Sequence, residues 1–234
     1  MEFLTQIGTI TSLDITALAL ILGLWVVTGW VIEHPPARHP SVSTLMKAYR
    51  RDWMVQFVTR QPRIFDATVI DSLRQGTAFF ASACMIAIGG GVALIGNAAL
   101  VEGLANDLTL ASGSLRVEVK VILVVAFLAN ALLKFIWAHR LFGYCSILMA
   151  AVPNDSAHPT ALHRAGQAAE INITAAKSFN RGLRAIYFAL GALGWMIGPG
   201  ALIIGALLTS FVLLRREFAS QSRQVMLQAP GAIE

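Results

Sequence analysis

The sequence predicts an all-α integral membrane protein, a polytopic helical bundle with about five transmembrane helices. Composition is the first reason, because 56% of the 234 residues are hydrophobic, 13% are charged and the mean hydropathy is +0.65. Soluble domains carry about twice that share of charge. The second reason is arrangement, since the charges lie in short stretches between long uncharged runs. Both observations exclude a water-soluble enzyme and favour one transmembrane domain over residues 1–234.

The charge balance indicates which partners to expect. There are 18 Lys+Arg against 13 Asp+Glu, a formal net charge of +5, and many of the basic residues flank hydrophobic segments. We therefore expect the lipid bilayer as a partner, with anionic phospholipid at the cytoplasmic face. No basic domain is present that would bind nucleic acid. Cys84 and Cys145 are too few for a disulfide framework and are predicted to be buried free thiols.

The first uncharged run covers residues 15–32 and predicts a span at about 14–32. A helix of this length extends about 27 Å and just crosses a hydrocarbon core. Glu2 and Asp14 precede the run where a signal peptide would carry positive charge, so we expect the segment to be retained. Pro35 and Pro36 follow and end the helix.

Residues 42–59 predict an amphipathic helix. Apolar and aromatic residues recur there at helical spacing, and Lys47, Arg50 and Arg51 lie between them. Two placements stay open at this point. The helix either lies in the membrane interface or packs on the protein's own cytoplasmic face.

The next two spans are expected at about 75–98 and 117–139. In the earlier one, Ala83, Ala87 and Gly91 repeat every four residues and predict a close helix contact. The connection at 102–114 carries acidic residues without Lys or Arg and is predicted to be periplasmic. The helical pattern continues well past the third span, and a second long helical pattern begins after residue 161. Helices three and four are therefore expected to extend into the cytoplasm.

The last apolar stretch, residues 185–214, is uncharged but is interrupted by Gly-Pro-Gly at 198–200. A hairpin would give spans at about 182–198 and 200–215, whereas one kinked helix would give four spans in all. The positive-inside rule favours the hairpin, because Arg181 and Arg215 then lie on one side. The prediction is five spans with four as the alternative, an outside N-terminus and a cytoplasmic C-terminus.

Polar side chains form a row, called a seam here, along the third helix (Asn130, Lys134, Arg140 and Tyr144) and another along the fourth helix (Asn172, Asn180 and Arg184). Polar side chains at membrane depth are energetically costly unless they have a hydrogen-bonding partner or a functional role. Consecutive helices are antiparallel, so we expect the seams to face each other near the inner leaflet. One interpretation is a hydrated cationic cavity for a small polar or anionic solute, and the other is interhelical hydrogen bonding. The candidate ligand-binding residues are Asn130, Lys134, Arg140, Tyr144, Asn172, Asn180 and Arg184.

The sequence predicts no catalytic residue, metal site or cofactor, and therefore no enzyme. Four of the five histidines form two pairs, His34 with His39 and His158 with His163, in or beside proline-rich loops, without the carboxylate partners of a helical metal motif. Asp66 and Asp71 lie beside Arg63 and Arg74. This arrangement favours structural ion pairs over acid–base catalysis.

Several short motifs together resemble a known family over about residues 15–220. They are Arg51-Asp52-Trp53-Met54, Arg60 and Arg63 with Asp66, Phe79-Phe80-Ala81-Ser82, Phe135-Ile136-Trp137 with Arg140 and Tyr144, Ala151-Val152-Pro153, Asn172, Asn180-Arg181-Gly182-Leu183-Arg184 with Tyr187-Phe188-Ala189-Leu190, Trp195, and Arg215-Arg216-Glu217-Phe218 with Ser220. The chain resembles the multi-pass bacterial and plant family numbered five hundred and ninety-nine in the domain-of-unknown-function series. The resemblance implies a bacterial inner-membrane protein and no particular activity.

Two functions are consistent with these observations. The leading hypothesis is an oligomeric module that binds or conducts a small polar or anionic solute through the polar seams. The alternative is a non-catalytic accessory or assembly subunit that docks another membrane protein complex. We expect a homo-oligomer or membership in a larger membrane complex.

Overall fold

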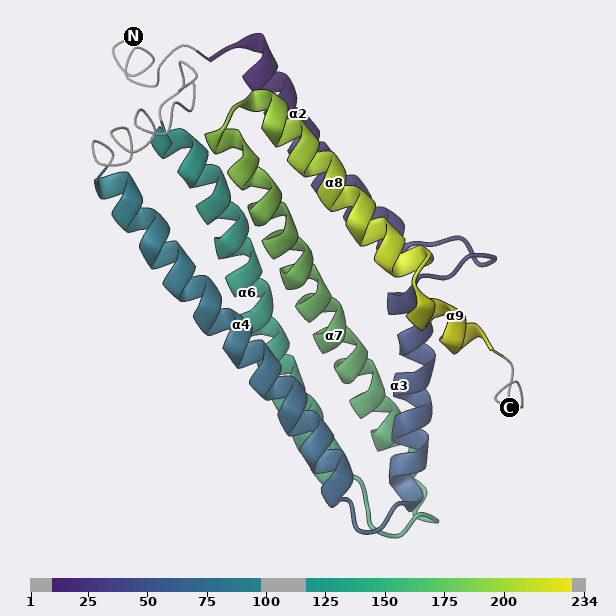
Figure 1. The fold of residues 1–234 in the computed structure, drawn as a ribbon. Helices are drawn as coiled ribbons and strands as arrows, with labels where there is room; N and C mark the ends of the chain where they lie inside the picture. Colours follow the sequence, from purple (N-terminus) through teal and green to yellow (C-terminus); the bar gives the residue numbers. More distant parts are fainter. Residues whose placement is uncertain (1–9, 98–116, 229–234) are drawn as a thin grey trace. The chain divides into compact units, whose positions relative to one another are not determined.

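The computed structural model describes residues 10–97 and 117–228, and every regular element in these ranges is a helix (Figure 1). The expected all-α class is thereby confirmed, whereas the loop predicted at 102–114 lies outside the described residues. The elements in chain order are α2 (Ser12–Glu33), α3 (Val42–Thr59), α4 (Ile64–Gly96), α6 (Val117–Ala150), α7 (Ala161–Ala192), the 3-10 helix η1 (Leu193–Met196), α8 (Pro199–Phe218) and α9 (Gln221–Leu227).

Three of the described helices, α2, α4 and α6, are long and apolar enough to cross a membrane. Between 11% and 28% of their most apolar segments is buried inside the protein. Most of the apolar surface of these segments is therefore exposed. Exposing so much apolar surface to water would be unfavourable, so the three helices are suited to a lipid environment. The chain therefore has the character of a membrane protein. The five-span count, the orientation of the termini and the cytoplasmic extensions stay predictions.

The chain divides into two compact units, and α4, α6 and α7 each contribute residues to both. Unit 1 comprises the described parts of residues 1–31, 83–132 and 183–215. Unit 2 comprises the described parts of residues 32–82, 133–182 and 216–234.

In unit 1, the last apolar stretch forms a helical hairpin, with the chain reversing at Gly198 between η1 and α8. A β-carbon on Gly205 would lie 2.5 Å from the carbonyl oxygen of Gly191, so the two backbones are nearly in contact there. The Thr209 hydroxyl also donates a hydrogen bond to the Tyr187 carbonyl at 3.4 Å. The stretch is therefore two antiparallel helices and not one kinked helix.

The predicted contact at Gly91 is also present in unit 1. A β-carbon on Gly91 would lie 2.6 Å from Cγ2 of Val125 on α6. The other two members of the four-residue repeat, Ala83 and Ala87, are exposed. The repeat therefore predicted one close contact correctly, but it does not form a continuous packing face.

The N-terminal end of α2 is joined to the hairpin by a buried carboxylate. Asp14 accepts a hydrogen bond from the indole nitrogen of Trp195 at 2.9 Å and another from the Thr11 hydroxyl at 2.6 Å. Because a buried carboxylate needs such donors, the two contacts position α2 against η1.

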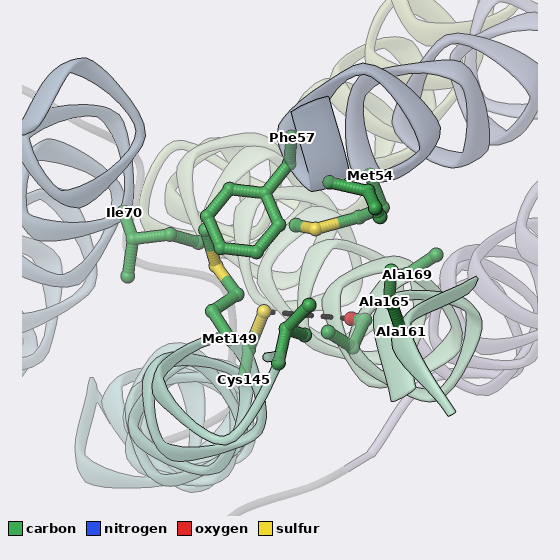
Figure 2. Close-up of a cluster of buried hydrophobic side chains, with 11 residues drawn as sticks. Met54, Phe57, Ile70, Cys145, Met149, Ala161, Ala165 and Ala169 are labelled. Atoms are coloured by element: carbon green, nitrogen blue, oxygen red, sulfur yellow. Dashed lines mark hydrogen bonds between the residues drawn. The ribbon is translucent and has the colours of Figure 1, made fainter. Parts of the chain in front are cut away.

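The core of unit 2 is built by α3, α4, α6 and α7. Figure 2 shows the Phe57 ring beside Ile70, Met54 and Met149. The alanines on α7 allow close approach, and the Cys145 thiol donates to the Ala168 carbonyl at 3.4 Å. The apolar face of α3 is therefore packed on the protein's own helices. The cluster comprises Met54, Phe57, Val58, Ile70, Cys145, Met149, Val152, Ala161, Ala165, Ala168 and Ala169.

Candidate functional site

A cavity of about 460 Å³ lies in unit 2 beside this core. Its volume is in the range of small-molecule sites, about 300–1,000 Å³. Phe57, Ile70 and Met149 belong both to the core and to the lining, so the core surface forms the apolar wall of the cavity (Figure 2). The lining residues are Phe57, Arg63, Ala67, Ile70, Asp71, Arg74, Ser146, Met149, Ala150 and Asn154.

The α4 side of the cavity is one helix face. Residues 67, 70, 71 and 74 are three or four positions apart, and residue 63 precedes the helix in the same register. Such spacing puts side chains one above another on an α-helix. The remaining lining residues come from the end of α3 and from α6 with the turn that follows it.

Arg63 is held firmly by its neighbours. Its guanidinium donates to the carbonyl oxygens of Val152 and Pro153, both at 2.8 Å, and to the Val58 carbonyl at 3.2 Å. Its Cζ atom lies 4.5 Å from the centre of the Phe57 ring. Arg63 therefore satisfies carbonyls that the ends of α3 and α6 leave unpaired, and it fixes the aromatic wall of the cavity. The Nε atom of Arg63 is buried without a hydrogen-bond partner among the described residues.

Arg74 lines the same cavity, about three helical turns further along α4. Its Nε atom is also buried without a partner among the described residues. Asp71 supplies the carboxylate of the lining and accepts a hydrogen bond from the Gln75 amide at 2.6 Å. Two guanidinium groups and one carboxylate give the lining a formal net charge of +1. Buried donors without acceptors are costly, and an anion in the cavity would supply acceptors.

Asp66 has the structural role that was expected, with a different partner. Its fully buried carboxylate forms an ion pair with Arg60 and accepts from the Trp53 indole at 2.6 Å. The neighbouring Arg63 binds backbone carbonyls instead. The ion pair of Asp66 therefore joins α3 to the start of α4.

The predicted seam on α7 lies against α3 in unit 2. Asn172 is fully buried, and its side-chain oxygen accepts a hydrogen bond from Arg50. The Asn180 amide donates to the Ser43 hydroxyl at 3.4 Å. Arg184 belongs to unit 1, where it is buried with its Nε near Gly29.

The predicted seam on α6 does not face these residues as expected. Arg140 and Tyr144 are exposed, and the Arg140 guanidinium donates to the Tyr144 hydroxyl. Lys134 is half-buried in unit 2, and Asn130 is half-buried in unit 1. Arg140 and Tyr144 therefore do not face the asparagines of α7: Asn172 contacts Arg50 of α3 and, on α6, Cys145 instead of a residue of the predicted seam. None of the seven predicted residues is among those lining the cavity, and ligand binding by them stays a prediction.

The model of DUF599, a family of proteins of unknown function, matches residues 16–222. The chain belongs to the DUF599 family. The family resemblance predicted from the short motifs is thereby confirmed. The match includes every residue that lines the cavity of this DUF599 protein, and also Arg50 and Asn172. No curated protein and no solved structure matches the chain.

Sequence reasoning missed the cavity of the DUF599 chain, although a signal was present. Residues 63, 67, 70, 71 and 74 share one helical face with an arginine at each end. The two arginines were interpreted only as ion-pair partners of Asp66 and Asp71. Both cysteines are free and buried, as predicted. In the described ranges, no group of three His, Cys, Asp or Glu residues is placed to hold a metal ion.

Proposed function

We propose that this DUF599 protein is a membrane protein that binds a small anionic solute in the cavity of unit 2. Arg74 is the principal cation of the site, because the terminal nitrogens of Arg63 already bind carbonyl groups. The proposal rests mainly on the two buried Nε donors that the described residues leave without an acceptor.

The charge of the lining supports an anion over a cation or a neutral solute. Asp71 offsets one of the two guanidinium charges, which leaves one positive charge in a partly enclosed space. Charges in such a space are screened less than charges on an open surface. An oxyanion would form charge-assisted hydrogen bonds there, and these are stronger than neutral ones.

Binding can be measured on the full chain in phosphatidylcholine nanodiscs. The probes are inorganic phosphate, acetate, decyl phosphate and decanoate, each at constant ionic strength, and the measurement is the melting temperature. A bound ligand at 100 times its Kd stabilises the folded state by about 2.7 kcal/mol. At least one probe should raise the melting temperature of the wild type, and Arg74→Gln should abolish that shift.

Arg51→Gln is the matched control. Arg51 is an exposed arginine that forms a surface ion pair with Glu170 and does not line the cavity. This variant should respond to the probe like the wild type. If no probe gives an Arg74-dependent shift, the proposal is overturned. A protein that binds none of the probes and co-purifies stoichiometrically with an unlike membrane complex would instead support the accessory function.

A further inference from the structure

We infer that the ligand of this cavity is an anionic amphiphile with a single alkyl chain. Its head group binds at Arg74, and its chain lies on the wall formed by Phe57, Ile70 and Met149. The inference rests on the proposed function and adds the chemical class of the ligand.

The separation of the two arginines favours an elongated ligand. Residues 63 and 74 both line the cavity, and the segment between them rises by about 16 Å along a helix. This rise separates the backbones of the two residues and gives the α4 side of the cavity the length of an elongated ligand. Because the terminal nitrogens of Arg63 are bound to carbonyls, the head group belongs at Arg74.

The lining between the arginines is suited to an alkyl chain. Ala67 and Ile70 lie on the same α4 face, and Phe57, Met149 and Ala150 complete the apolar side. The methionine side chain is flexible and adapts to irregular apolar ligands. A hydrophilic anion would leave this apolar wall in contact with water, whereas a chain would cover it.

Arg63 acts as a positioning residue in this arrangement. Its guanidinium lies over the Phe57 ring at 4.5 Å and also joins the end of α3 to the turn after α6. These contacts hold the aromatic wall of the cavity in place. The lining therefore contains a cation, Arg74, whose Nε atom has no acceptor among the described residues, and an aromatic ring that Arg63 holds in place.

A comparison of three probes tests the inference on the full chain in phosphatidylcholine nanodiscs: inorganic phosphate, decyl phosphate and decanol. Each buried methylene should strengthen binding about fourfold. We therefore expect decyl phosphate to bind at least about 100-fold more tightly than inorganic phosphate. Arg74→Gln should reduce its affinity to that of decanol, and Arg74→Lys should retain most of it, which separates loss of charge from loss of fold.

Filling the cavity with a larger side chain tests where the alkyl chain of the ligand lies. Ala67→Phe should weaken the binding of decyl phosphate at least tenfold, because the ring would occupy space that the alkyl chain needs. Thr68→Phe is the matched control, because Thr68 is an exposed neighbour on α4 outside the lining and should bind decyl phosphate like the wild type. An equal loss of affinity for decyl phosphate in both variants would contradict an alkyl chain that lies beside Ala67.

The outcomes separate the inference from the proposed function. Equal, Arg74-dependent affinities for phosphate and decyl phosphate would overturn the inference and leave the function standing. Equal affinities for decanol and decyl phosphate, or no Arg74-dependent binding at all, would overturn both. Displacement of bound decyl phosphate by lysophosphatidic acid in the bilayer supports the inference with a lipid as the source. Displacement by aqueous decanoate alone supports it with a free fatty-acid-like molecule as the source.

Discussion

The guanidinium of Arg50 on α3 donates a hydrogen bond to the side-chain oxygen of Asn172, which is fully buried on α7. The Asn172 amide in turn donates to the sulfur of Cys145 on α6 at 3.6 Å. Burial lowers the pKa of the Arg50 guanidinium from its ordinary value, but arginine keeps its charge in proteins. A partly buried positive charge is therefore paired with a neutral amide, and the two contacts of Asn172 join three helices of unit 2.

Replacing Asn172 by Leu should lower the free energy of unfolding by about 2–3 kcal/mol, because the variant leaves the partly buried Arg50 charge without its acceptor and forces a different side-chain shape into a fully buried position. A denaturant titration in mild detergent measures this change. The matched control is Glu170→Gln, two residues earlier on α7, which breaks an ion pair whose side chains are 55% and 58% exposed. The control should cost less than about 1 kcal/mol. Equal losses in both variants would contradict the role given to Asn172.

Gly91→Ala should destabilise the protein by about 1–3 kcal/mol, because its new methyl group would lie 2.6 Å from Val125. Gly90→Ala is the control, since no neighbouring atom lies within 4 Å of its β-carbon position. That variant should be neutral or slightly more stable, because alanine is the better helix former. The melting temperatures of the two variants, measured in the same detergent, test this prediction. Identical melting temperatures would mean that α4 and α6 are not in contact at Gly91.

Gly205→Ala should be more harmful than Gly91→Ala. The atom that its β-carbon would meet at 2.5 Å is the backbone carbonyl oxygen of Gly191, which cannot rotate away as a side chain can. The two legs of the hairpin would have to separate, so we expect a loss at the upper end of the range for overpacking, about 3 kcal/mol. Gly200→Ala, with open space at its β-carbon position, should melt like the wild type. A Gly205→Ala variant with the melting temperature of the wild type would show that the two legs of the hairpin are not in close contact at Gly205.

The hairpin also gives a topology prediction. Its two legs run antiparallel, so the chain leaves the hairpin on the side where it entered, and the basic residues at both ends favour the cytoplasm. A green fluorescent protein fused to the C-terminus should fluoresce, and an alkaline phosphatase fused at the same place should be inactive. The reverse pattern would place the C-terminus outside and rule out the five-span topology.

The candidate site was only partly accessible to sequence reasoning. Helical angles on α7 correctly placed Asn172 and Asn180 on related faces, but an angle about one helix axis does not specify which neighbour that face meets. The structure brings Arg50 and Ser43 of α3 to these residues, more than a hundred positions away in the chain. Arg140 and Tyr144 satisfy each other on the surface of α6, an outcome that the spacing of four allows equally well.

The sequence by itself determined the all-α class, the three helices that are apolar enough to cross a membrane, the membership in DUF599 and the close contact at Gly91. Hydropathy, helical period and residue size are local properties, and they can be read along the chain. Only the tertiary structure decided that the last apolar stretch is a hairpin, that Asn172 accepts from Arg50, and that Arg63 and Arg74 line one cavity. These features depend on the packing of segments distant in sequence, because a buried donor is satisfied by whichever acceptor the packing brings within reach.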